Sequence, residues 1–209
     1  RIGRVAEIVI PFMAGSYVLM SVIIIFLNLT EVPEVFGLIF RSAFGFEPAF
    51  SGIIGMAISW GVKRGIYSNE AGQGTAPHAA SAAEVSHPAK QGLVQAFSVY
   101  VDTLFVCTAT ALMILFTGQY NVTNETGGFI VENLPGTPFG PEFTQFAIDT
   151  HFPSFGSGFV AIALLFFAFT TIMAYYYIAE TNLTYLNKDG TQTWKLWGLR
   201  SLILFATFY

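Results

Sequence analysis

The stretch FPSFGSGFVAIALLFFAFTTIMAYYYIA occupies residues 152–179 and contains no Asp, Glu, Lys or Arg. A helix needs about 20 mainly apolar residues to cross a bilayer, so this stretch predicts a membrane-spanning helix. Thr170 and Thr171 fall near its centre, at the depth where transporters bind coupling ions. The alternative is an ordinary pair of threonines whose hydroxyls bond to the preceding turn of their own helix.

The composition of the whole chain indicates a membrane protein. Hydrophobic residues make up 54% and charged residues 11%, and the mean hydropathy is +0.59. Soluble domains carry about a quarter charged residues. The single cysteine, Cys107, gives no disulfide framework and no cysteine metal site. No basic stretch with interleaved aromatic residues indicates a nucleic-acid partner, so the lipid bilayer is the expected surrounding.

Apolar runs along the chain predict four complete spans and part of a fifth. We expect these spans at about residues 8–30, 43–62, 92–117, 156–180 and 196–209. Together they form a single transmembrane domain over residues 1–209. The chain opens on Arg1 with no initiating Met and no cleavage pattern, so we expect an internal fragment of a longer multi-pass protein.

The Lys and Arg residues predict the orientation of the spans. Eight of the nine lie near the N-terminus, in the loop 63–91 or between residues 188 and 200, whereas Arg41 lies on the other side. The positive-inside rule therefore places those three segments in the cytoplasm and the loop 118–155 outside. The Gly and Pro content of this outer loop predicts irregular structure with short interfacial helices, and its length would allow it to act as a lid.

The predicted second span, 43–62, is short and rich in glycine. Each glycine weakens a helix by about 1 kcal/mol. A short, glycine-interrupted span is typical of a discontinuous helix in a secondary transporter, whereas close helix packing through Gly52 and Gly55 is an equally good reading. If the helix breaks, the residues expected to face a substrate pocket are Ile58, Ser59, Trp60 and Gly61, with Trp60 as an apolar wall.

Two further features have competing interpretations. The polar stretch 61–78 lacks the Gly-Lys-Ser/Thr ending of a phosphate loop, so we expect a structural cytoplasmic loop, followed by a short helix around Ala79–Ala83. Asp102 lies inside the third span, where a carboxylate is costly and therefore a functional candidate. Packing against a Thr or Tyr of a neighbouring helix explains Asp102 equally well.

Three motifs resemble one known family. They are GVKRGIYSNEAGQGTAPHAA at 61–80, AAEVSHPAKQGLVQAFSVYVDTLFVC at 82–107 and FFAFTTIMAYYYIAE at 166–180. The chain is similar, over essentially its whole length, to the bacterial alanine or glycine:cation symporters of the leucine-transporter-like superfamily. The resemblance implies an all-α polytopic fragment of an inverted-repeat (5+5) fold, whose short second span is a discontinuous helix. It also implies sodium-coupled, sometimes proton-coupled, uptake of alanine or glycine across the bacterial inner membrane.

The resemblance also implies a site. Thr170 and Thr171 would be hydroxyl ligands of sodium, the Phe167 carbonyl would be a further ligand, and the remaining ligands would come from the first repeat. Tyr175, one turn beyond Thr171, closes the pocket floor or belongs to an aromatic belt. We expect no cofactor beyond the coupling sodium ion and no enzyme activity. The alternatives from other classes are an intramembrane enzyme that uses Asp102 and a passive channel.

Overall fold

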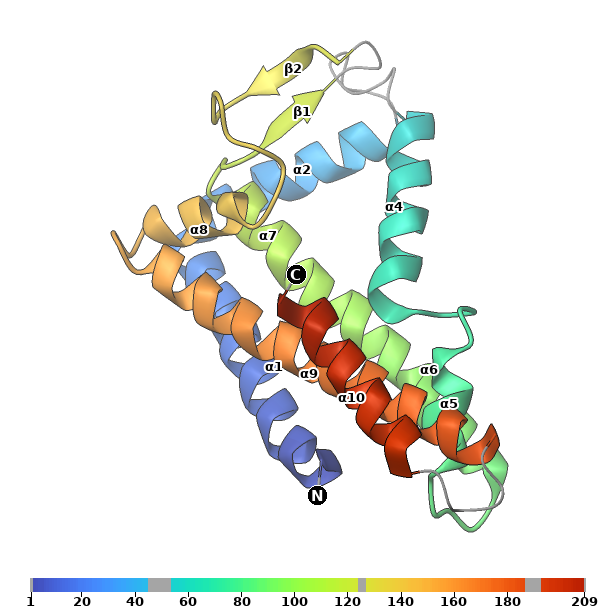
Figure 1. The fold of residues 1–209 in the computed structure, drawn as a ribbon. Helices are drawn as coiled ribbons and strands as arrows, with labels where there is room; N and C mark the ends of the chain where they lie inside the picture. Colours follow the sequence, from blue (N-terminus) through green and yellow to red (C-terminus); the bar gives the residue numbers. More distant parts are fainter. Residues whose placement is uncertain (1, 45–53, 124–126, 187–192, 209) are drawn as a thin grey trace.

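A computed structural model describes residues 2–44, 54–123, 127–186 and 193–208. The described chain is mostly helical (Figure 1). Its helices are α1 (Ile2–Leu27), α2 (Val32–Ala43), α4 (Ile54–Asn69), α5 (Thr75–Ser81), α6 (Pro88–Val101), α7 (Thr108–Phe116), α8 (Glu142–Asp149), α9 (Gly156–Leu186) and α10 (Thr193–Phe208). A 3-10 turn at Leu29–Glu31 follows α1, and a π-helical segment at Asp102–Cys107 joins α6 to α7.

Three helices in the described part of the chain are long and apolar enough to cross a membrane. They are Ile8–Leu27 in α1, Pro88–Phe116 through α6 and α7, and Gly156–Leu186 in α9. These segments overlap the positions of the first, third and fourth spans expected from the sequence, and they are consistent with a polytopic membrane protein. The expected second span, 43–62, falls partly outside the described residues, and the helix there is α4.

The core lies where α1, α7, α8 and α9 meet. Its fully buried side chains include Ile24 of α1, Met113 of α7 and Ile148 of α8. Tyr17 of α1 belongs to this cluster and its hydroxyl lies 2.8 Å from the Thr110 hydroxyl, while the buried Ser21 hydroxyl of α1 donates to the Ala109 carbonyl at 3.0 Å, so both polar groups are paired. Val160, near the start of α9, is the buried residue that this helix contributes to the cluster.

The segment expected to be an irregular outer loop contains a hairpin and a packed helix. Strand β1 (Asn121–Thr123) pairs antiparallel with β2 (Phe129–Glu132), which corrects the all-α expectation. The side chain of Asn121 bonds both the N–H and the carbonyl of Leu134 at 2.8 Å and so closes the turn after β2. Helix α8 buries Ala147 completely, so this part of the loop belongs to the core.

The turn between α8 and α9 explains the glycine at its end. The Gly156 N–H donates to Asp149 Oδ1 at 2.7 Å, which satisfies a donor at the start of α9. A Cβ atom at Gly156 would collide with the carbonyl oxygen of Gln145. Only glycine allows α8 and α9 to approach this closely.

The sequence prediction of a helix break at Ile58–Gly61 is wrong. Helix α4 runs without interruption from Ile54 to Asn69 and therefore through all four residues. A glycine costs a helix about 1 kcal/mol but keeps both backbone hydrogen-bonding groups, so a few glycines weaken a helix without ending it. The chain leaves the helix later, after Asn69.

Candidate functional site

The interruption after α4 is a five-residue linker, residues 70–74. Three of its residues have positive φ: Glu70 at 54°, Gly72 at 80° and Gly74 at 88°. Glycine adopts this conformation without penalty, whereas a glutamate is strained there. The Gln73 side chain donates to the Ile66 carbonyl at 3.1 Å and covers an otherwise free acceptor at the end of α4. Helix α5 begins directly after the linker, four residues before the short helix expected around Ala79–Ala83, and ends at Ser81.

The linker is joined to α9 by one direct hydrogen bond. The hydroxyl of Tyr175 donates to Glu70 Oε1 at 2.6 Å, between residues 105 positions apart in the sequence. Tyr175 is 49% exposed, so this bond lies at the edge of the packed region. Tyr175 also lines a groove between α9 and α10, together with Thr171. The structure therefore places this residue beside the interruption and one turn from the threonine pair.

The two threonines and Phe167 bring three oxygen atoms together. The hydroxyls of Thr170 and Thr171 both donate to the carbonyl oxygen of Phe167, at 3.0 and 2.8 Å. Each hydroxyl retains lone pairs that can face a cation. Hydroxyl and carbonyl oxygens are ligands for hard cations, so this donor set fits part of a sodium site. The same bonds also fit the alternative, in which the two threonine hydroxyls only bond to the preceding turn of their own helix.

The end of α4 packs against the π-helical segment through polar contacts. The Ser68 hydroxyl donates to Asp102 Oδ2 at 2.7 Å and lies 3.3 Å from Cys107 Sγ. The next residue, Asn69, donates to the Thr103 hydroxyl at 3.2 Å. π-Helical turns are rare and occur frequently at functional sites. Asp102 is thus paired with a serine of a neighbouring helix, where the sequence analysis expected a Thr or Tyr.

A cavity connects these features. This central cavity has a volume of about 250 Å³, and its polar wall residues include Tyr17, Ser68, Cys107 and Thr110. Phe167 closes another side and packs edge-on against Tyr17, with ring centroids 6.1 Å apart. The cavity therefore adjoins both the Phe167 turn that holds the oxygen group and the Ser68–Asp102 pair.

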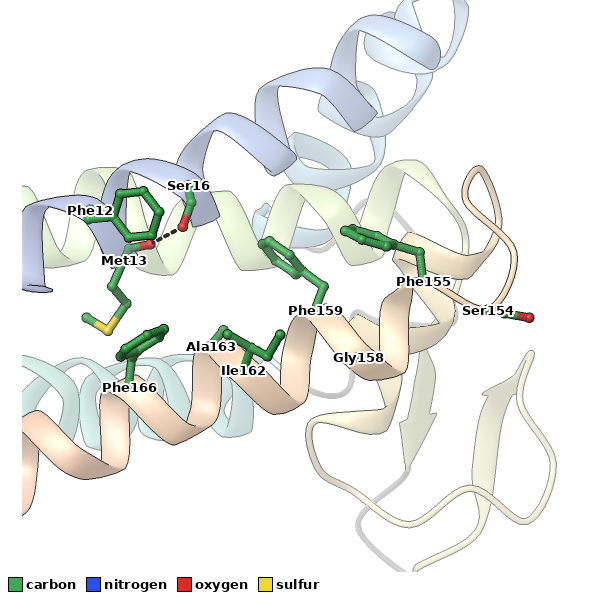
Figure 2. A pocket seen from close by; sticks show the side chains of 10 residues that line it. All are labelled: Phe12, Met13, Ser16, Ser154, Phe155, Gly158, Phe159, Ile162, Ala163 and Phe166. Carbon is green, nitrogen blue, oxygen red and sulfur yellow. Dashed lines mark hydrogen bonds between the residues drawn. The ribbon is translucent and has the colours of Figure 1, made fainter.

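A second cavity, between α1 and α9, has a different chemistry (Figure 2). Aromatic and aliphatic side chains dominate its walls, among them Phe12, Phe159 and Phe166. The Ser16 hydroxyl on its wall is already bonded to the Met13 carbonyl at 2.9 Å. This cavity offers no charged group to an amino acid and suits an apolar occupant.

Trp60 and Gly61, two of the residues expected around the helix break, are not among the residues that line the central cavity. Trp60 is 52% exposed and packs under two cations of its own helix, with Lys63 Nζ at 5.2 Å and Arg64 Cζ at 5.6 Å from the ring. Gly61 has open space around its Cα. The side chains of Ile58 and Ser59 lie outside the described residues. A role of these four residues in substrate binding stays a prediction.

Comparison with known proteins identifies the family. The model of the sodium:alanine symporter family matches residues 1–209. This chain belongs to the sodium:alanine symporter family. By its name, this is a family of symporters, which are transporters and not enzymes.

Named relatives support the same assignment. The chain is 66% identical to the putative sodium/proton-dependent alanine carrier protein YrbD of Bacillus subtilis, over 100% of this chain and 43% of that protein. It is 62% identical to the sodium/proton-dependent alanine carrier protein of Bacillus sp. strain PS3, over 100% of this chain and 47% of that protein. It is 44% identical to the probable sodium/glutamine symporter GlnT of Bacillus subtilis, over 90% of this chain and 37% of that protein. The chain thus spans less than half the length of these relatives.

Sequence reasoning missed the part of the site around the linker. The sequence predicts only a structural cytoplasmic loop over 61–78, although the two glycines at positive φ mark the interruption of the helix. The contacts of Ser68 and Glu70 do not follow from the sequence, because their partners lie on the π-helical segment and on α9. The π-helical turn has no pattern in residue type that would have revealed it.

Proposed function

We propose that this chain is part of a sodium-coupled symporter that carries alanine or glycine into bacterial cells across the inner membrane. The observation that carries the proposal is the group of three oxygens from Phe167, Thr170 and Thr171 within the apolar helix α9. Polar groups at this depth of the membrane are costly and commonly mark ion pathways, so an oxygen group inside a membrane-spanning helix supports a cation site. The family assignment supports sodium as that cation.

The proposed fold is an inverted repeat of two five-helix units, to which this chain contributes the end of the first and much of the second. The interruption between α4 and α5 supports it, because discontinuous helices form the sites of such transporters and expose backbone groups to substrate and ion. In this fold the carrier alternates between two states that open the same site to opposite sides of the membrane. The linker 70–74, which the sequence analysis places in a cytoplasmic loop, and the Phe167 turn of α9 are in this proposal the parts of the site that this chain supplies.

A small neutral amino acid is the substrate that these features support best. The central cavity of about 250 Å³ lies below the range of about 300–1,000 Å³ typical of pockets for drug-sized ligands. Two of the relatives are named alanine carriers, whereas the relative named for glutamine is less similar. Tyr175, Ile58, Ser59, Trp60 and Gly61 stay the substrate contacts proposed from the sequence, although other residues line the central cavity.

The test is uptake of labelled alanine by the full-length protein in liposomes. With an inward sodium gradient, we expect alanine to accumulate above its external concentration, and with equal sodium on both sides we expect only equilibration. Equilibration under both conditions would indicate a passive channel. Chemical conversion of the alanine would indicate an intramembrane enzyme, for which Ser68 and Cys107 beside Asp102 would be the nucleophile candidates.

A further inference from the structure

Asp102 lies near the middle of the candidate span Pro88–Phe116, where an ionised carboxylate is costly. Its oxygen Oδ2 accepts a hydrogen bond from the Ser68 hydroxyl at 2.7 Å and a longer contact from the Cys107 thiol at 3.9 Å. Both partners are uncharged. These contacts stabilise a carboxylate by hydrogen bonding but do not neutralise its charge, so a binding partner of positive charge fits this position.

The ligands described around Asp102 favour a proton over a metal ion. Hard metal cations take about six or more oxygen ligands. The contacts around Asp102 bring in the Ser68 hydroxyl, and the neighbouring Thr103 hydroxyl is already bonded to Asn69. Within the described residues there is no group of three or more His, Cys, Asp and Glu side chains that could hold a metal ion. A proton needs only one carboxylate oxygen.

The other charged and titratable groups on the surrounding elements are less suited than Asp102 to take up and release a proton. Those described on α1, α4, α6 and the π-helical segment are Tyr17, Lys63, Arg64, Tyr67, Lys90, Tyr100 and Cys107, and α7 carries none. Lys63 and Arg64 lie over the Trp60 ring, and Lys90 bonds Ser86. Tyr17 and Cys107 line the central cavity, but ordinary phenols and thiols keep their protons at neutral pH, whereas ordinary carboxyl groups lose them.

We propose that Asp102 is the proton-carrying group of this symporter and that Ser68 is its positioning partner. A proton from the aqueous phase forms an O–H bond with a carboxylate oxygen of Asp102, and the same bond breaks when the proton leaves on the other side. No other covalent bond is made or broken. This inference rests on the proposed function, since it assigns a second coupling ion to the same transport cycle.

The Ser68 hydroxyl can serve both protonation states. A hydroxyl is both donor and acceptor, so it donates to the carboxylate and accepts from the carboxylic acid after a rotation of its hydrogen. Ser68 lies one residue before the end of α4 and lines the central cavity. The linker follows directly and bonds Tyr175 through Glu70. Protonation of Asp102 therefore acts at the point where α4 meets the cavity and the linker.

The experiment measures protons that accompany alanine. The full-length protein in liposomes, with a pH-sensitive dye inside and equal sodium and pH on both sides, receives external alanine. We expect internal acidification for wild type and for the control Asp149→Asn, whose side chain bonds Gly156 outside this region, and a loss of at least tenfold for Asp102→Asn. Acidification by Asp102→Asn equal to wild type would overturn the proposal. So would a wild type that accumulates alanine on a sodium gradient but moves no protons, and this result would leave the sodium-coupled function intact.

A second variant covers the case in which Asp102→Asn fails to fold. Ser68→Ala removes the hydrogen bond that positions the carboxyl group, so alanine-driven acidification should fall about fivefold relative to alanine uptake. Asp102→Glu keeps a carboxyl group and should keep alanine-driven acidification. An unchanged ratio of acidification to alanine uptake in Ser68→Ala, or loss of acidification in an Asp102→Glu variant that still takes up alanine, would contradict the assignment.

Discussion

The hydroxyl of Tyr175 lies 2.6 Å from Glu70 Oε1, and this hydrogen bond joins α9 to the linker between helices α4 and α5. Glu70 holds a positive φ of 54°, which costs a non-glycine residue about 1–3 kcal/mol. A residue in a strained backbone conformation persists only when contacts with the surrounding structure hold it there. The bond to Tyr175 is one such restraint, and it connects the linker to the helix that carries the threonine pair.

Tyr175→Phe should loosen the linker without unfolding the protein. The lost hydrogen bond is half-exposed, so we expect a cost of about 1 kcal/mol, which corresponds to roughly fivefold faster opening. Hydrogen exchange of the amides of residues 70–74 in the full-length protein measures this effect. Tyr185→Phe, on the same helix at a position that is 73% exposed, is the control and should exchange as wild type does. Equal exchange rates in both variants would show that the contact does not hold the linker.

Gly156→Ala should destabilise the packing of α8 on α9. The new Cβ would collide with the Gln145 carbonyl, and such overpacking costs about 1–3 kcal/mol. Gly158→Ala, two residues further along, is the control because its Cβ would meet nothing within 4 Å. The fraction of protein that stays soluble and folded in detergent after heating should fall for the first variant only. An equal loss for both would mean that helix propensity, not the collision, matters here.

The membrane orientation predicted from the positive residues can be tested by cysteine labelling. In a background with Cys107→Ala, we expect Lys90→Cys to stay unlabelled in intact cells by a reagent that does not cross membranes. Glu132→Cys in strand β2 should label readily, because that residue is exposed and lies in the predicted outer loop. Labelling at position 90 but not at 132 would invert the topology.

The sequence predicts the long helices well because their signal is continuous. A run of about 20 apolar residues has few alternatives to a membrane-spanning helix, and the residues 152–179 accordingly fall largely within α9. The same reasoning failed for α4. The glycine content of 52–61 predicts a break, but the helix continues through residues 58–61 and ends at Asn69, and glycines 72 and 74 just after it adopt positive φ. Glycine alone does not tell where a helix stops.

The site was predictable only where it is local in the sequence. Phe167, Thr170 and Thr171 lie within one turn, so their oxygen group follows from helical spacing alone. The Ser68–Asp102 pair joins residues 34 positions apart, and the Tyr175–Glu70 pair joins residues 105 positions apart. Such pairs depend on how the helices pack, which a single sequence does not reveal. Asp102 was noticed because of its charge, but its partner was not.

Thr171→Ala should weaken the sodium dependence of uptake far more than the folding of the protein. The substitution removes one proposed oxygen ligand and keeps good helix propensity. The control Thr184→Ala removes an equivalent bond of the same helix, from the Thr184 hydroxyl to the Glu180 carbonyl. We expect the sodium concentration for half-maximal alanine uptake to rise about tenfold or more in the first variant only, and Thr171→Ser to restore it. An unchanged value in Thr171→Ala would remove this residue from the sodium site.

The central claim is that sodium and alanine cross the membrane together, and coupling of this kind must be reciprocal. The most direct test measures the entry of labelled sodium into liposomes that contain the full-length protein, with equal sodium on both sides and an inward gradient of alanine. We expect alanine to drive sodium inward against its own equilibrium, and leucine, which is larger, to drive little. Sodium entry that does not respond to alanine would contradict the account.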